Sequence, residues 1–246
     1  MDPAGKVALV AGGNGNLGTA IVATLRARGV NVAVVDIEPA TAPSADEKTL
    51  TVQADIADDA SAGAAVAEVV AAFGRIDILV NAAGFIHSEA LVNLFAPAHR
   101  RHAIETWERV LRANLSATFV LTSHVAEHMA AKRIKGVIVN FSSVASGGNP
   151  GQSAYAAAKA GIEALTCVWA RELGSFGIRA VAIAPGFVDT PSTARSLNEA
   201  AIKEWKRRTP LHRLASAGEI TSAVMFAIEN DFLTGQTLRI DGGLTI

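Results

Sequence analysis

Seven short apolar runs, separated by long helix-like stretches, constrain the fold of this 246-residue chain more than any other feature of its sequence. The runs occupy residues 6–11, 31–35, 49–54, 76–81, 136–141, 179–184 and 237–240. Most are continuously apolar, as is typical of parallel strands covered on both faces. The stretches between them, such as 59–73 and 153–176, are rich in alanine and long enough to be crossover helices. This alternation predicts an α/β fold, a doubly wound seven-stranded parallel sheet with helices on both faces.

Composition narrows the class of protein. Half of the residues are hydrophobic and the formal net charge is −1, which gives no electrostatic basis for binding nucleic acid or an anionic membrane. The single cysteine, Cys167, cannot form an internal disulfide, and no cysteine–histidine spacing indicates a metal site. The start of the chain does not resemble a signal peptide, and no apolar run is long enough to span a membrane. We expect one soluble, cytoplasmic domain over residues 1–246.

A glycine-rich loop follows the first apolar run. Gly13, Gly15 and Gly18 satisfy the pattern GxGxxG, in which the backbone can approach a pyrophosphate at the start of a helix. The loop alone is weak evidence, because a plain glycine-rich turn would look the same. Asp36 directly follows the second run, at the end of the expected strand, where a carboxylate can accept hydrogen bonds from both hydroxyls of an adenosine ribose. Together these features predict a dinucleotide site.

At this point the sequence resembles the short-chain dehydrogenase/reductase family, whose members have a single-domain Rossmann fold. The family loop TGxxxGxG is matched at Gly12 and Gly18, while Ala11 replaces the threonine and Asn16 replaces the middle glycine, a position where asparagine would tolerate positive φ. Further motifs follow in family order over essentially the whole chain: Asp55-Ile56, Asn81-Ala82-Ala83-Gly84, Asn114, Ser142-Ser143, Tyr155-Ala-Ala-Ala-Lys159, Pro185-Gly186 with Val188 and Thr190, and Asp241-Gly242-Gly243.

The resemblance implies a set of cofactor-binding residues. They are Gly12, Asn14, Gly15, Asn16, Leu17, Gly18, Asp36, Ile37, Asp55, Ile56, Asn81, Ala82, Ala83, Gly84, Tyr155, Lys159, Pro185, Gly186, Val188 and Thr190. Asp36 would repel a 2′-phosphate, and no basic residue stands at Gly15 or Ile37 to offset it. The expected cofactor is therefore NAD rather than NADP.

Catalysis is expected from Asn114, Ser143, Tyr155 and Lys159. Tyr155 and Lys159 share one helix face, so the ammonium should lower the pKa of the phenol and let it act as general acid and base. By resemblance, Lys159 also holds the nicotinamide ribose and Asn114 holds a water. Ser142 and Ser143 are both candidates for the serine that binds substrate, and counting from the strand favours Ser143. We expect hydride transfer between NAD and a secondary alcohol or ketone, a small-molecule substrate held by Ser143, Tyr155 and Phe187.

Two other functions remain open. Residues 151–162 resemble an NADPH-dependent 3-oxoacyl-carrier-protein reductase, and a non-catalytic dinucleotide-sensing protein could use the same fold.

Substrate choice is expected from residues 85–106 and from a helical lid at about 187–214. The family and the apolar helices at 103–130 and 153–176 indicate a homo-oligomer, a tetramer or possibly a dimer. His124 and His128 match a zinc-protease pattern, but a plain helix face at a subunit contact or in solvent fits them better.

Overall fold

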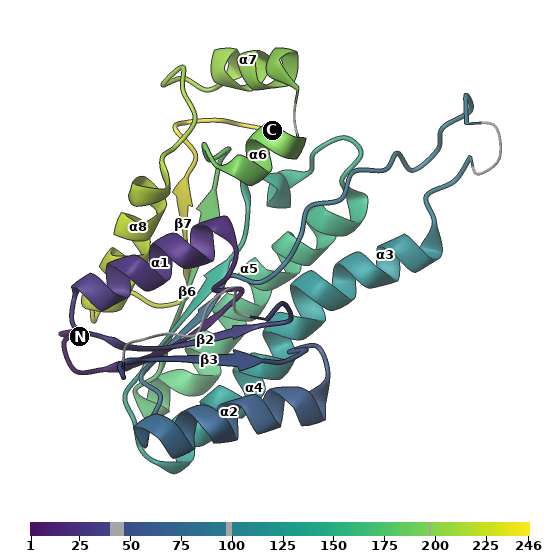
Figure 1. The fold of residues 1–246 in the computed structure, drawn as a ribbon. Coiled ribbons are helices and arrows are strands. Elements are labelled where there is room, and N and C mark those ends of the chain that lie inside the picture. Colours follow the sequence, from purple (N-terminus) through teal and green to yellow (C-terminus); the bar gives the residue numbers. More distant parts are fainter. Residues whose placement is uncertain (40–46, 97–99, 197) are drawn as a thin grey trace.

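The computed structural model describes residues 1–39, 47–96, 100–196 and 198–246. In these residues seven parallel strands form one sheet in the order β3-β2-β1-β4-β5-β6-β7 (Figure 1). The strands are β1 (Val7–Ala11), β2 (Asn31–Asp36), β3 (Thr49–Gln53), β4 (Ile78–Asn81), β5 (Val137–Phe141), β6 (Arg179–Pro185) and β7 (Gln236–Ile240). The predicted fold class is confirmed, and strand boundaries differ from the sequence-based ranges by at most two residues.

Helices cover both faces of the sheet, as predicted. One face carries α1 (Asn16–Ala27) and α8 (Ala217–Glu229); the other carries α2 (Asp59–Phe73), α4 (Ala117–Ala131) and α5 (Ser153–Leu173) (Figure 1). Successive residues of β1 point to opposite faces, so Leu9 packs in the core under α2, α4 and α5, whereas Val10 packs in the core under α1 and α8. Strands buried on both sides require apolar residues at every position, which explains the continuous runs in the sequence.

The helical stretch expected at 103–130 is not one regular helix. It consists of α3 (Ile104–Leu111), a five-residue π-helical segment η1 (Arg112–Ser116) and α4. π-Helical segments are rare in proteins, and those that occur are often found at functional sites. The π-helical segment contains Asn114, which is fully buried.

The order of strands reverses between β1 and β4, and the chain leaves every parallel strand at the same edge of the sheet. Ligands of such folds bind in the crevice at this edge. The expected lid lies above it as two short helices, α6 (Pro191–Ser196) and α7 (Glu199–Arg208), rather than one (Figure 1). Residue 197 of the lid lies outside the described residues.

The segment between β4 and α3 extends away from the body of the molecule (Figure 1). Val92 and Arg101 pair across it as an antiparallel bridge, and His102 N donates to Leu91 O over 3.0 Å. Residues 97–99 of the predicted specificity segment 85–106 lie outside the described residues. In the described part of the chain, no helix is both long and apolar enough to cross a membrane.

Candidate active site

The glycine loop fits tightly between its neighbours. Gly12 has a φ of 75°, and a Cβ atom on it would lie 2.7 Å from the backbone nitrogen of Ala83. A Cβ on Gly18 would lie 2.0 Å from the carbonyl oxygen of Gly12. No side chain fits at either position, so the β1–α1 turn and the segment after β4 are held in backbone contact.

The amino end of α1 is open to an anion. Gly15 is the N-cap, no side chain caps the helix, and the first turn contains no acidic residue. Asn16 is the first helical residue, and the positive φ of the turn is found at Gly12. The replacement of glycine by Asn16 therefore needs no positive φ, and the turn forms without one at this position. The free N–H groups and the close backbone approach fit a dinucleotide pyrophosphate.

Asp36 lies beside this loop at the end of β2. Its Oδ2 atom accepts a hydrogen bond from Asn14 N over 3.0 Å, and its Oδ1 atom accepts one from Glu38 N over 3.2 Å. The carboxylate is only partly buried, and the neighbouring Ile37 side chain is 62% exposed. The predicted ribose-binding carboxylate and the loop are thus brought together.

Asp55 and Ile56 are less available than the sequence suggested. The Asp55 carboxylate accepts a hydrogen bond from Arg112 Nη2 over 2.8 Å and another from Ala57 N over 2.9 Å. The Ile56 side chain is buried in the core under α2. A cofactor contact by Ile56 would therefore involve its main chain.

Tyr155 and Lys159 meet Ser143 at the carboxyl end of β5. The Tyr155 ring packs against Val110 and Ala145. The Ser143 side chain lies close enough to the Tyr155 hydroxyl to lower its pKa. Lys159 Nζ lies 5.5 Å from the centre of the same ring and donates to Phe141 O over 2.9 Å. Three side chains from two elements therefore converge at one point.

Burial is the largest cause of the pKa shifts of Tyr155 and Lys159. It raises the pKa of Tyr155 to about 12, and the Ser143 side chain lowers that pKa only in part. It lowers the pKa of Lys159 to about 8. The expectation that Lys159 depresses the pKa of Tyr155 is wrong for this arrangement, because desolvation of the phenolate is the largest cause and the ammonium is directed at Phe141 O. With a pKa of about 12, the Tyr155 side chain is a neutral phenol at pH 7.

Asn114 faces the same point from the π-helical segment. Its Nδ2 atom donates to Phe85 O and to Val110 O, each over 3.0 Å. Its Oδ1 atom is buried without a hydrogen-bond partner. A Cβ on Gly84 would lie 2.3 Å from this oxygen and 3.7 Å from Lys159 Nζ, so glycine keeps the approach open. An acceptor left unpaired next to an ammonium fits a bound water.

The two serines after β5 point in different directions. Ser142 is buried and its hydroxyl donates to Glu163 Oε1 over 2.8 Å. Ser143 is the serine beside Tyr155, and its Oγ atom also accepts from Ala145 N over 3.1 Å. The geometry therefore favours Ser143 as the residue that meets a substrate oxygen, although its catalytic role stays a prediction.

The other predicted cofactor residues lie at or after the carboxyl ends of β4 and β6, at the same edge of the sheet. Asn81 is buried and donates to Thr122 and Asn140, and Ala82 packs in the core under α1. Gly186 approaches Asp241 so closely that a Cβ would lie 2.8 Å from its Cα atom. The Thr190 hydroxyl lies 3.0 Å from those of Ser192 and Thr193.

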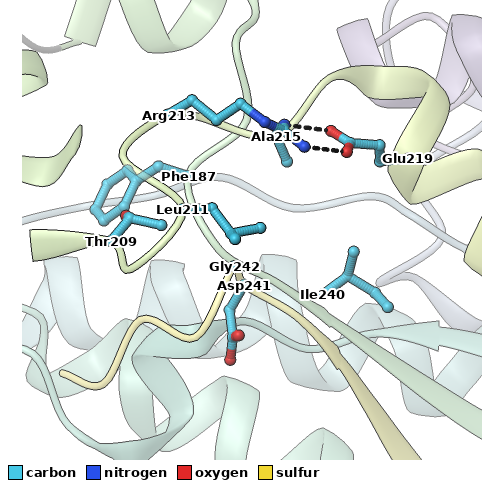
Figure 2. Close-up of a pocket in the computed structure, with 9 residues that line it drawn as sticks. All are labelled: Phe187, Thr209, Leu211, Arg213, Ala215, Glu219, Ile240, Asp241 and Gly242. Carbon is cyan, nitrogen blue, oxygen red and sulfur yellow. Dashed lines mark hydrogen bonds and ion pairs between the residues drawn. The ribbon is translucent and has the colours of Figure 1, made fainter.

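Phe187 points toward the lid. Its ring stacks on Trp205 of α7 with 4.3 Å between ring centres, and the Arg208 guanidinium lies 4.6 Å from the Trp205 ring centre. Figure 2 shows a small cavity between Phe187, Leu211 and Ile240, near the Arg213–Glu219 ion pair. Among the predicted site residues that the structure describes, Phe187 alone lines this cavity. The cavity therefore belongs to the lid and β7, not to the point where Tyr155 and Ser143 meet.

The histidine pair on α4 has no metal geometry. His124 Nε2 lies 2.9 Å from Asp59 Oδ1 of α2, and burial lowers the pKa of His128. Within the residues that the structure describes, no group of three or more His, Cys, Asp or Glu side chains could hold a metal ion. His124 thus joins two helices on one face of the sheet.

Comparison with known proteins agrees with the predicted family and fold class. A family model described as enoyl-(acyl carrier protein) reductase matches residues 11–245. The chain is 36% identical to the 3-oxoacyl-[acyl-carrier-protein] reductase FabG of Thermotoga maritima, with 98% of each chain covered, and 36% identical to that of Escherichia coli, with 99% of each covered. It is also 36% identical to the short-chain reductase protein NovJ of Streptomyces niveus, over 97% of this chain and 93% of that one.

The chain belongs to the short-chain dehydrogenase/reductase family. It is therefore an oxidoreductase that uses a nicotinamide dinucleotide.

Three residues near the site were not found from the sequence. Arg112 binds Asp55, Glu163 binds Ser142, and Trp205 stacks on Phe187. Glu163 alone carried a signal, because it follows Lys159 by four residues on the helix that contains Tyr155. The other two contacts join segments that are far apart in the sequence.

Replacing each serine separately tests which one acts. Ser143→Ala should lower kcat by roughly 10²-fold, because it removes a hydrogen-bond donor to the substrate oxygen. Ser142→Ala should lower kcat less than about 10-fold, since that hydroxyl binds Glu163. Steady-state kinetics would measure both, with thermal melting as the control for folding. A larger loss in Ser142→Ala than in Ser143→Ala would reverse the assignment.

Proposed function

We propose that this chain transfers a hydride between NAD and the carbon of a secondary alcohol or ketone, with Tyr155 as general acid and base. The convergence of Ser143, Lys159 and Tyr155 beside the glycine loop carries this proposal. Residues 1–246 would act as one domain, with residues 187–214 as the lid. In the direction of reduction, the neutral phenol is already in the state needed to protonate a carbonyl oxygen.

The residues around the crevice fit the dinucleotide. Gly12, Gly18 and the amino end of α1 would hold its pyrophosphate, and Asp36 would hold its adenosine ribose. The bound nicotinamide supplies or accepts the hydride. Lys159 would bind the second ribose.

The chain's own groups would handle the proton and the substrate oxygen. The Ser143 hydroxyl orients the substrate oxygen, and the Tyr155 hydroxyl gives or takes the proton. The unpaired Asn114 Oδ1 would hold a water through which Lys159 exchanges protons with solvent. Each of these residues has a separate task.

Tyr155→Phe tests the proton transfer directly. The change removes one hydroxyl and keeps the ring that packs against Val110 and Ala145. Folding and NAD binding should survive, while turnover should fall by at least about 10². Absorbance of the reduced cofactor would follow turnover, and cofactor fluorescence would measure binding. Turnover near the wild-type rate in Tyr155→Phe would contradict the proposed mechanism.

The choice of NAD rests on the charges around Asp36. A carboxylate at the end of β2 accepts hydrogen bonds from a 2′-hydroxyl and repels a 2′-phosphate. The adjacent position holds the exposed apolar Ile37, and the N-cap of α1 is Gly15. Neither can offset the repulsion.

Replacing Asp36 by Ala and Ile37 by Arg should narrow or reverse the preference between the two cofactors. The wild type should favour NAD by on the order of 10² in kcat/KM, since like charges at a partly buried site repel strongly. The pair of changes removes the repulsion and adds a cation for the phosphate. The measurement is kcat/KM with each cofactor, with Glu38→Ala as a control for loss of a nearby charge. A wild type that uses NADP as efficiently as NAD would refute the choice.

A 3-oxoacyl thioester is the second candidate substrate, with NADPH as its cofactor. The observation that favours it is the 36% identity to two proteins named 3-oxoacyl-[acyl-carrier-protein] reductase. Comparing a 3-oxoacyl thioester with simple ketones under each reduced cofactor separates the candidates. A non-catalytic dinucleotide sensor would have no use for the grouping of Asn114, Ser143, Tyr155 and Lys159, and no substrate would be turned over in that screen.

Substrate choice is proposed to come from the segment 85–106 and the lid. Phe85 adjoins the site, because its carbonyl accepts from Asn114 and its ring lies 5.5 Å from the Arg109 guanidinium carbon. Within the lid, the stack of Phe187 on Trp205 joins α7 to the start of the segment that follows β6. Transplanting both segments into a relative should transfer the substrate preference. An unchanged preference would show that the pocket lies elsewhere.

We also propose a homo-oligomer, a tetramer or a dimer, in the cytoplasm. Large apolar side chains remain exposed along α4, α5 and the turn that follows: Phe119 at 51%, Val168 at 43% and Phe176 at 52%. Exposed apolar surface of this kind marks subunit contacts. Light scattering at micromolar concentration tests this, and a monomer would contradict it.

A further inference from the structure

The carboxylate of Glu163 holds the loop that carries Ser143. Its Oε1 atom accepts hydrogen bonds from the hydroxyls of Ser142, over 2.8 Å, and Ser146, over 2.6 Å. These residues lie on either side of Ser143, at the two ends of the turn that follows β5. One oxygen atom therefore fixes the backbone before and after the proposed catalytic serine.

Glu163 lies on the same face of α5 as Tyr155 and Lys159. Tyr155, Lys159 and Glu163 are spaced by four residues on α5, so their side chains line one side of the helix. The Glu163 side chain is 22% exposed, and its Oε2 atom lies 3.3 Å from Arg239 Nη2 of β7. Bonds to a carboxylate are stronger than those between neutral groups, and partial burial limits competition from water.

We propose that Glu163 is a positioning residue for the reaction: it fixes the Ser142–Ser146 loop to α5 and thereby sets the place of Ser143 relative to Tyr155. This inference rests on the proposed function for its kinetic consequences. Among the described residues, Glu163 makes no hydrogen bond with Ser143 or Tyr155. Its effect on turnover would act through the loop.

The two carboxylate oxygens of Glu163 make different contacts: Oε1 binds the two serines and Oε2 faces Arg239. Substitutions can therefore remove the ion pair alone or both contacts, which distinguishes a positioning role from a general structural one. The substitution Glu163→Gln would keep an oxygen able to accept both serine hydrogen bonds and would lose only the ion pair with Arg239. Glu163→Leu would lose both interactions at similar size. Glu172→Leu is the matched control, because Glu172 is an exposed acid on the same helix.

The test combines kinetics with amide hydrogen exchange on the full chain. Glu163→Leu should lower kcat by roughly 10-fold to 100-fold and leave the Kd for the cofactor within about two-fold. Glu163→Gln and Glu172→Leu should retain most of the wild-type kcat. Exchange of residues 142–147 should speed up in Glu163→Leu but not in the other two variants. Equal losses in Glu163→Leu and Glu163→Gln would overturn the proposal.

A double-mutant cycle tests whether Glu163 acts through Ser142 and Ser146. Ser142→Ala with Ser146→Ala should reproduce the loss of kcat in Glu163→Leu, and combining all three changes should add little further loss. Losses that multiply would show that Glu163 acts by another route and would overturn the proposal. A wild type that turns over no alcohol or ketone would refute the proposed function alone, and the exchange of residues 142–147 would still decide the role of Glu163.

Discussion

All seven strands run in one direction, so the loop that follows each strand begins at one edge of the sheet. This constraint explains how Asp36, Asn81, Ser143 and Pro185, which are far apart in the sequence, come to surround one crevice. A parallel sheet is stable only when helices cover both faces, because its strands are apolar on both sides. The helices that satisfy this requirement also carry the proposed site residues: α1 has an uncapped amino end at this edge, and α5 contains Tyr155 and Lys159.

Burial sets the electrostatics of the site more strongly than the pairing of charges does. Lys159 is buried with its ammonium on Phe141 O, and its pKa falls to about 8, while the pKa of Tyr155 rises to about 12. A low-dielectric environment penalises the phenolate and the ammonium alike, so each group shifts toward its neutral form. A site of this kind holds its proton on the phenol until a ligand changes the balance, which suits donation to a carbonyl.

The fold was predictable from the sequence because strands buried on both faces leave continuous apolar runs. The helix face of Tyr155 and Lys159 was predictable because a spacing of four residues needs no tertiary information. The direction of the pKa shift of Tyr155 was not, since it depends on how deeply α3 and the loop after β5 bury the ring. The π-helical turn around Asn114 and the bond between Arg112 and Asp55 also depend on contacts that no local pattern encodes.

Several features of the site oppose stability and are held in place by the surrounding core. Asn81 Oδ1 and Asn114 Oδ1 are buried without hydrogen-bond partners, and the buried Lys159 ammonium donates to the carbonyl of Phe141. Unpaired polar atoms cost roughly 1–3 kcal/mol each, a cost that the extensive apolar core beneath them must offset. Such atoms are useful only where a ligand or water completes them. At Asn114 the unpaired oxygen lies at the same glycine, Gly84, as Lys159 Nζ, so the missing partner that weakens the fold leaves an acceptor there for a water or a ligand.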